Sequence, residues 1–240
     1  RDLLAQGTQA LEQLGIVAHA WALIQLGLLA QQIDGAAGAG RGLALGRATL
    51  NGKGKRLILD LDGTQWYADG VDDIVDRGLM NGTGPVTFEP NSTMTRAMLV
   101  TVLWRSAGSP NEGTNGFTDV PADQWYTQAV AWAAQNGIVN GVGNNKFDPD
   151  AKITREQLAA VLYRYAGKVG MDVTARADLK LFPDAGSVSA YATDALSWCV
   201  ANGIVNGTLE HGTAYLDPQG SATRAQVATL MSRYLKLTEA

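Results

Sequence analysis

Apolar residues recur with helical spacing in three stretches of the chain, and each stretch predicts a helix, a turn-rich loop and a second helix in that order. In the second stretch, the first helix carries an apolar stripe that consists of Trp125, Ala129, Trp132 and Ala133. Gly137 follows the stripe and predicts a left-handed end to this helix. The pattern therefore predicts a helix–loop–helix unit of about 50 residues.

The second helix of this unit has a well-marked start. Phe147 and Pro149 belong to the preceding loop, where the proline fixes φ and the apolar ring anchors the segment. Thr154 predicts an N-cap, and Gln157, three residues later, completes a capping box. The buried stripe of this helix is predicted to contain Leu158, Val161, Leu162 and Tyr165.

The same order of residues occurs three times. Residues 117–165 are echoed by residues 182–234, and another copy lies upstream at residues 58–105. In the first two copies the aromatic residue near the start precedes the capping threonine by 29 residues, whereas the third copy has 32 because it carries a three-residue insertion around residues 210–213. The first copy has a methionine where the other two have the glutamine of the capping box, so its helix start is predicted to be held less firmly.

Three such copies in tandem predict an all-α fold, because a single helix pair of this size cannot bury its apolar faces alone. Their predicted boundaries are residues 57–109, 117–168 and 181–237. A helical fragment at residues 1–34 and a glycine-rich linker at residues 35–56 are predicted to precede them. Because the sequence opens without methionine or a signal-peptide pattern, we expect it to be a piece of a longer protein.

Composition and charge exclude several classes of function. Residues 1–56 carry a net charge of +3 and residues 57–240 one of −7, and the latter contain no run of Lys or Arg, so a nucleic acid partner is not expected. The longest apolar run, residues 16–30, is shorter than the roughly 20 residues of a membrane span. One cysteine and two histidines exclude an internal disulfide and a Cys/His zinc cluster.

The candidate catalytic and cofactor-binding motifs lack residues that their chemistry requires. The segment from Asp60 to Gly63 begins like a calcium loop, but the positions that require glycine and glutamate hold Gln65 and Val71. Cys199 occupies an alanine position inside a predicted helix, which predicts a small buried side chain. The sequence offers no phosphate-binding loop and no nucleophile beside a base. We therefore expect no catalysis, no metal site and no cofactor.

The repeats resemble S-layer homology domains, the modules that hold bacterial surface proteins on the cell wall. The resemblance rests on the FTDV...WY opening, the NGIVNG turn, the F-x-P loop and the Thr-Arg start of the second helix, in this order in each copy. It implies a pseudo-threefold bundle with grooves that bind a secondary cell-wall polysaccharide bearing a pyruvate ketal on N-acetylmannosamine. That ligand is anionic, and the implied location is extracellular, at a bacterial cell wall or S-layer.

Each N-cap threonine is directly followed by an arginine, at Arg96, Arg155 and Arg224. A cation in the first helical turn opposes the macrodipole at a cost of roughly 0.3 to 1 kcal/mol, so a compensating anion is expected. One hypothesis is that exposed helix N–H groups and the guanidinium bind a carboxylate of the ligand. The alternative is an internal ion pair with the aspartate that opens each copy, namely Asp60, Asp119 and Asp184, and both hold if the aspartate orients the arginine.

Two further sets of equivalent residues are candidates for the site. An aromatic residue lies at the start of the first helix of each copy, at Trp66, Trp125 and Tyr191. It suits stacking on a sugar ring, but it suits the core as well, whereas Trp132 and Trp198 are assigned to packing. A glycine lies in the turn after each first helix, at Gly82, Gly141 and Gly207. These glycines either let the backbone approach a sugar or only supply the φ that the turn requires.

These observations favour a non-catalytic module that anchors a surface protein to the wall by binding an anionic, pyruvylated polysaccharide. In this hypothesis the arginines, aspartates, aromatic residues and glycines named above form the binding sites. The alternative is a protein-interaction scaffold that binds partners or self-assembles in a surface layer.

Overall fold

The computed structural model describes residues 49–50, 57–58, 60–84, 86–111 and 113–239. These residues form one compact unit. The predicted helical fragment 1–34 and the predicted linker 35–56, apart from residues 49–50, lie outside the described residues.

The described part of the chain is mainly helical, as predicted. Its α-helices are α3 (Ala68–Asp76), α4 (Arg96–Ser106), α5 (Thr127–Gln135), α6 (Arg155–Lys168), α7 (Thr193–Ala201) and α8 (Arg224–Thr238). The short 3-10 helices η1 (Leu179–Leu181), η2 (Ala185–Ser187) and η3 (Ala190–Ala192) precede α7. Two small antiparallel sheets depart from the all-α prediction, and they pair β1 (Thr49–Leu50) with β2 (Leu57–Ile58) and β3 (Thr208–Glu210) with β4 (Thr213–Tyr215). The β3–β4 hairpin contains the insertion of the third repeat.

The helix boundaries follow local signals in the sequence. Capping boxes begin α6 and α8, whereas Thr95 caps α4 without a box, as the methionine at position 98 predicts. Gly137 has a φ of 69° just after α5, in the left-handed region that was predicted for the helix end. The α-helices α3, α5 and α7 begin two residues after the aromatic residues Trp66, Trp125 and Tyr191, which therefore lie outside these α-helices, Tyr191 within η3.

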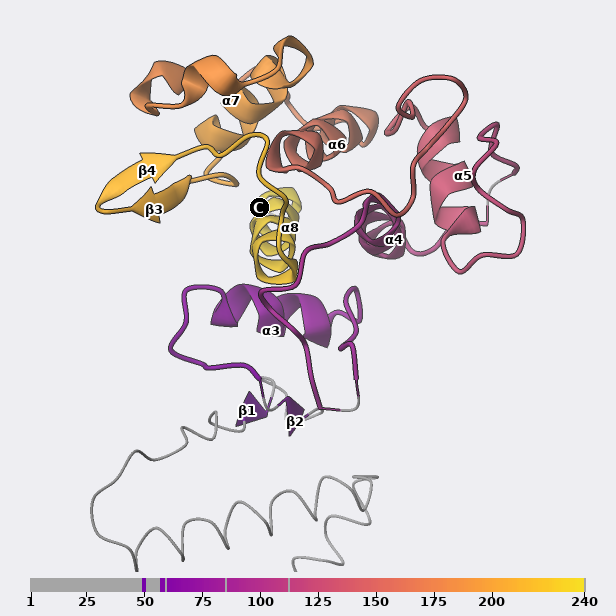
Figure 1. The fold of residues 1–240 in the computed structure, drawn as a ribbon, viewed down its shortest axis with the longest axis horizontal. Helices are drawn as coiled ribbons and strands as arrows, with labels where there is room; N and C mark the ends of the chain where they lie inside the picture. The colour runs from indigo at the N-terminus through magenta and orange to yellow at the C-terminus, as the bar shows by residue number, and fades with distance from the viewer. Residues whose placement is uncertain (1–48, 51–56, 59, 85, 112, 240) are drawn as a thin grey trace, which may run out of the picture. The chain divides into compact units, whose positions relative to one another are not determined.

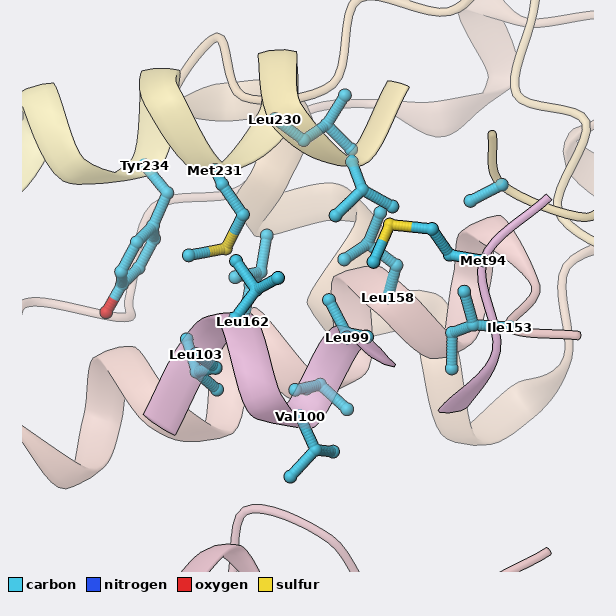
Figure 2. Packing of buried hydrophobic residues seen from close by; sticks show 14 of the residues in the cluster. Met94, Leu99, Val100, Leu103, Ile153, Leu158, Leu162, Leu230, Met231 and Tyr234 are labelled. Carbon is cyan, nitrogen blue, oxygen red and sulfur yellow. The ribbon is translucent and has the colours of Figure 1, made fainter. Parts of the chain in front are cut away.

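The second helices of the three repeats share one hydrophobic core. Figure 2 shows side chains of α4, α6 and α8 packed together, with Met94 and Ile153 from the segments that lead into α4 and α6. The helix residues labelled in this view are Leu99, Val100, Leu103, Leu158, Leu162, Leu230, Met231 and Tyr234, and apart from Leu230 each is 2 % exposed or less. The structure thus confirms the prediction that the repeats share one core.

Each second helix packs against the first helix of another repeat. Helix α4 contacts α5, α6 contacts α7, and α8 contacts α3, so the last repeat closes on the first. In Figure 1, α3, α5 and α7 lie around the outside of α4, α6 and α8. The contacts therefore join the repeats in a cycle.

Backbone hydrogen bonds at the centre follow the same cycle. The N–H of Met94 donates to the carbonyl of Ala222 at 3.0 Å, that of Ala222 to Ile153 at 2.9 Å, and that of Ile153 to Met94 at 3.0 Å. Each of these residues lies two positions before the helix-starting arginine of its repeat. The three helix starts are thus fixed relative to one another by main-chain contacts.

The aspartate that opens each repeat holds the F-x-P loop of the same repeat. Asp119 accepts hydrogen bonds from the N–H groups of Phe147 and Asp148, both at 2.8 Å. Asp60 and Asp184 make the same pair of bonds to the loops at residues 88–89 and 216–217. The second residue of each pair has a positive φ, between 47° and 58°, which is costly for a residue with a side chain. The carboxylate stabilises that conformation by accepting both N–H groups.

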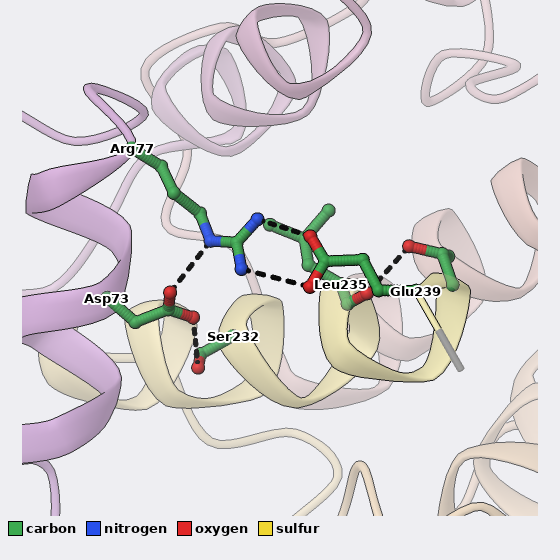
Figure 3. A network of polar contacts seen from close by, with 6 residues as sticks. Asp73, Arg77, Ser232, Leu235 and Glu239 are labelled. Carbon is green, nitrogen blue, oxygen red and sulfur yellow. Dashed lines mark hydrogen bonds and ion pairs between the residues drawn. The ribbon is translucent and has the colours of Figure 1, made fainter.

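A polar network reinforces the contact between α3 and α8 (Figure 3). Arg77 donates to Asp73 at 2.7 Å and to Glu239 at 2.6 and 3.2 Å. The buried hydroxyl of Ser232 donates to the other oxygen of Asp73 at 2.6 Å. Asp73 lies at the position that Trp132 occupies in the second repeat. The interface of α3 therefore has polar contacts at this position, whereas α5 has a buried indole there.

Removing Asp73 should weaken the closure between the first and last repeats. Asp73→Ala leaves the buried Ser232 hydroxyl without its acceptor, and we expect the free energy of unfolding to fall by about 1–2 kcal/mol. Glu239→Ala removes only an exposed partner of Arg77 and should cost clearly less. Urea unfolding followed by circular dichroism measures both variants. Equal losses in the two variants would contradict this account of the network.

Removing Asp119 should destabilise the fold through its loop. Asp119→Ala takes away both acceptors of the 147–148 backbone, and we expect a loss of about 2 kcal/mol in the same urea experiment. Asp150→Ala removes a nearby exposed carboxylate as a matched control and should change the free energy of unfolding by less than about 0.5 kcal/mol.

The effect of Asp119 should also depend on pH. Burial alone would raise the pKa of Asp119, but the backbone N–H groups of Phe147, Asp148 and Asp119 itself, with the charge of Lys146, outweigh it and lower this pKa. A lowered pKa means that Asp119 contributes stability above its unfolded pKa of about 3.9 and loses that contribution as the pH falls through the folded-state pKa. The difference between wild type and Asp119→Ala should therefore stay constant near neutral pH and shrink below about pH 4. A difference that persists at pH 2 would contradict the ionised acceptor.

Candidate ligand-binding grooves

The three helix-starting arginines are buried, which corrects the expectation that they lie at open helix ends. Arg96, Arg155 and Arg224 are only 8 %, 5 % and 8 % exposed. Their Nε–H groups donate to the carbonyls of Phe147, Leu216 and Phe88 at 2.8, 2.8 and 2.6 Å. Each arginine thus binds the loop of another repeat, and Arg96 and Arg224 also lie over the rings of Phe147 and Phe88.

The helix N–H groups beside these arginines are not available to a ligand either. The N–H of Arg96 donates to Ala151 and that of Ala97 to Pro149, and the starts of α6 and α8 make the equivalent bonds. The physical reason is the cyclic packing, because each F-x-P loop lies directly across the start of a helix from another repeat. The loop carbonyls take the positions that an external anion was expected to fill.

The aspartates do not form the ion pairs that were the alternative. In the part of the chain that the structure describes, no ion pair or hydrogen bond joins Asp60, Asp119 or Asp184 to the three arginines. Instead, Asp119 holds the N–H of Phe147, and the carbonyl of the same residue accepts from Arg96. The aspartate therefore positions the loop, and the loop binds the arginine.

Burial also governs the charge state of these arginines. Desolvation lowers the pKa of Arg155, and the negative charges of Asp217 and Asp184 partly offset that change. Burial likewise lowers the pKa of Arg96 and of Arg224. The charges of Asp148 and Asp119 partly offset this change at Arg96, and those of Glu89 and Asp60 do so at Arg224. A guanidinium stays protonated in proteins, so three positive charges lie beneath the inter-repeat surfaces.

The aromatic residues at the equivalent positions are exposed, so of the two alternatives for them, sugar stacking and core packing, the core is wrong. Trp66, Trp125 and Tyr191 are 62 %, 57 % and 52 % exposed. The indole of Trp125 packs edge-on against the buried ring of Tyr126, with centroids 5.1 Å apart, and Trp66 packs on Tyr67 in the same way. The following tyrosine thus takes the core position and supports an aromatic face that is open to solvent. Trp132 and Trp198 are buried, as predicted.

Trp125 borders a pocket of about 120 Å³ that three repeats build together. Arg224 comes from the third repeat, Trp125 from the second, and the remaining lining residues from the first. We call this site the Trp125 pocket, and it is lined by Met80, Asn81, Met94, Met98, Thr101, Val102, Arg105, Trp125 and Arg224. Two of these side chains are cationic and none is acidic. The second Nη of Arg224 donates to the carbonyl of Asn81 at 2.7 Å, which fixes the guanidinium against the pocket wall.

The sequence analysis missed Arg105 and its equivalents. Arg105, Arg164 and Arg233 each lie nine positions after the helix-starting arginine and are partly exposed. Each donates through Nη1 to a carbonyl at the turn after the first helix, at Leu79, Ile138 and Ile204. The repeated spacing of the two arginines was the available signal.

The equivalent site around Tyr191, to which all three repeats contribute, differs in its chemistry. We call it the Tyr191 site, and its residues are Arg96, Glu156, Arg164, Ser189 and Tyr191. The Tyr191 hydroxyl donates to Glu156 at 2.9 Å. The pKa of Tyr191 is raised to about 12, first by burial and then by the hydrogen bond to Glu156 and the negative charge of Glu156. The positive charges of Arg164 and Arg96 act in the opposite direction.

The turn glycines serve the backbone. Gly141 and Gly207 have φ values of 74° and 82°, and a Cβ at Gly141 would lie 2.5 Å from the Lys146 carbonyl oxygen. The structural requirement is therefore sufficient to explain glycine at both positions. Gly82, which follows the pocket residue Asn81, is half-buried.

Other candidate chemistry is limited in the described residues. Cys199 is fully buried, and burial strongly raises the pKa of its thiol, as expected of a packing residue. Among the same residues, no group of three or more His, Cys, Asp or Glu side chains is placed to hold a metal ion. None of the helices described is long and apolar enough to span a membrane.

Comparison with known proteins agrees with this picture. A family model described as the S-layer homology domain matches residues 58–97, 116–159 and 181–228. A surface-layer 125 kDa protein of Lysinibacillus sphaericus is 32 % identical over 75 % of this chain and 15 % of its own length. An amylopullulanase of Thermoanaerobacterium thermosulfurigenes is 30 % identical over 69 % of the chain and 9 % of its own length. The S-layer protein sap of Bacillus anthracis is 27 % identical over 72 % of the chain and 20 % of its own length.

The chain thus spans a fifth or less of each of these relatives. The three matched segments, in contrast, cover more than half of the chain itself, in the order of the three repeats. The chain therefore belongs to the S-layer homology domain family, which indicates an extracellular place at the cell wall or S-layer and a role in surface anchoring.

Proposed function

We propose that this chain is a non-catalytic anchoring module that binds an anionic secondary cell-wall polysaccharide, with the Trp125 pocket as a main binding site. The observation that carries the proposal is the lining of this pocket, which combines Arg105 and Arg224 with an exposed indole and contains no acidic side chain. The pyruvate ketal that the family resemblance implies supplies a carboxylate to such a pocket.

The two arginines suit the charged part of the ligand. A guanidinium binds a carboxylate through parallel N–H donors, and such charge-assisted bonds are stronger than neutral ones. Arg224 is held by Phe88 and Asn81, so its position is set before a ligand arrives. Arg105 is half-exposed, with one nitrogen bound to Leu79, and retains further donors.

Trp125 suits the sugar ring. Its indole is 57 % exposed at the edge of the pocket and packs against Tyr126 in a T-shaped arrangement. A flat apolar face beside cations favours an acidic sugar over a simple inorganic anion. Trp66 is similarly exposed and packs on Tyr67 in the same way at its own interface, where it can contribute to a second site.

We further propose that the three repeats are related by a pseudo-threefold axis. The cyclic bonds among Met94, Ile153 and Ala222 support this symmetry, and so does the cyclic pairing of first and second helices. In such an arrangement the module presents three related inter-repeat sites, which differ through their individual residues.

Truncating Trp125 should weaken polymer binding without unfolding the module. We expect Trp125→Ala to lower the affinity for purified wall polysaccharide by about tenfold, because the stacking face is lost. Leu209→Ala removes another exposed apolar side chain, from β3, and is the matched control, which should bind like wild type. Sedimentation with the purified polymer measures binding, and thermal unfolding checks the fold. Wild-type binding by Trp125→Ala would contradict the role of this pocket.

Removing the ketal from the polymer should abolish most of the binding. Mild acid hydrolysis cleaves the pyruvate and leaves a neutral sugar, so the charge-assisted bonds to the arginines cannot form. We also expect binding to intact polymer to weaken as salt increases, because screening acts on ionic contacts near a surface. Undiminished sedimentation with the hydrolysed polymer would overturn the proposed ligand class. Retention of partner binding or lattice formation without polymer affinity would instead favour a scaffold.

A further inference from the structure

Glu156 is a buried carboxylate with a complete set of internal partners. It is 2 % exposed and accepts from the N–H of Ser189 at 3.0 Å, from the hydroxyl of Ser189 at 2.8 Å and from the hydroxyl of Tyr191 at 2.9 Å. Gln219 donates to the Ser189 hydroxyl at 3.2 Å and extends the network. A carboxylate from the second repeat thus occupies polar donors of the third repeat.

This carboxylate is charged at neutral pH. Burial alone would raise the pKa of Glu156, but the hydrogen bonds from Ser189 and Tyr191, with Gln219, outweigh it and lower this pKa. Both Arg96 and Arg164 act electrostatically on Tyr191, to which Glu156 is bonded. A fixed negative charge therefore lies at the same site as the two arginines that would attract an external anion.

The other two interfaces lack this arrangement. The residue after the helix-starting arginine is Glu156 in the second repeat, whereas the first and third repeats have Ala97 and Ala225. The aromatic residue at the interface with Glu156 is Tyr191. At the equivalent positions, the interface with Ala97 has Trp125 and the interface with Ala225 has Trp66. The chain thus couples a glutamate with a hydroxyl donor at one interface and an alanine with an indole at the other two.

We propose that Glu156 acts as a built-in carboxylate ligand of the Tyr191 site, so that this site binds an acidic sugar more weakly than the Trp125 pocket does. The inference rests on the proposed function and adds a ranking of the sites. Two effects produce the ranking: the negative charge of Glu156 opposes a second carboxylate, and the Tyr191 hydroxyl is already used as a donor. A like charge at the range of one side chain weakens binding on the order of tenfold.

Fluorine NMR can follow the two sites separately. The protein is labelled with fluorotryptophan or fluorotyrosine, and the Trp125 and Tyr191 signals are assigned with Trp125→Phe and Tyr191→Phe. The probe is the methyl glycoside of N-acetylmannosamine carrying the pyruvate ketal, and the glycoside without the ketal is the control. We expect the Trp125 signal to shift at a probe concentration about tenfold lower than the Tyr191 signal.

Glu156→Gln removes the charge while keeping the size and an acceptor oxygen. We expect it to lower the midpoint at Tyr191 by about tenfold and to leave the midpoint at Trp125 unchanged. Glu210→Gln removes an exposed carboxylate from β3 and is the matched control, which should change neither midpoint. Circular dichroism verifies that each variant is folded.

The reciprocal experiment transplants the network into the Trp125 pocket. Asp123→Ser with Trp125→Tyr supplies the donors, and adding Ala97→Glu supplies the carboxylate. We expect the triple variant to bind the probe at position 125 about tenfold more weakly than the double variant. This comparison isolates the carboxylate from the change of aromatic ring.

The outcomes separate this inference from the proposed function. Equal midpoints at Trp125 and Tyr191 in the wild type, or no change at Tyr191 in Glu156→Gln, would overturn the role of Glu156 while leaving the pocket assignment in place. No shift at Trp125 with the ketal probe would overturn the proposed function, and the ranking with it.

Discussion

The contact on which this structure most depends is the hydrogen bond from an arginine Nε to the loop carbonyl of another repeat. It occurs three times, and each time an aspartate holds the accepting loop from the other side. Because the loop lies across a helix start, it also accepts the first backbone N–H groups of that helix, which are otherwise left without partners. One short loop therefore caps a helix, positions a cation and joins two repeats.

In this arrangement the charged residues have different roles. The helix-starting arginines are primarily structural, and only part of a guanidinium, such as that of Arg224, reaches a pocket. The more accessible cation of the pocket is Arg105, and the aromatic surface is Trp125. A substitution of Arg224 would thus disturb folding and the proposed ligand contact together, whereas substitutions of Arg105 and Trp125 would separate the two more cleanly.

Much of the fold was predictable because its signals are local. The capping boxes at Thr154 and Thr223 and the left-handed residue after α5 depend only on neighbouring residues, and all three are present. The surroundings of Arg155 were not predictable, since they depend on which loop reaches the helix start from another repeat. The exposure of Trp125 was ambiguous for a similar reason, because it lies just before the helix while Tyr126 takes the buried position.

The closure of the last repeat on the first has a mechanical consequence. The contact between α3 and α8 joins segments that are far apart in sequence, and Arg77 reaches Glu239, the last of the described residues. A pulling force applied across residues 60–239 would load this interface directly, before it reached the hydrogen bonds at the centre. The closing interface would therefore carry that load first, and the polar contacts around Asp73, together with the buried side chains between α3 and α8, would resist its separation.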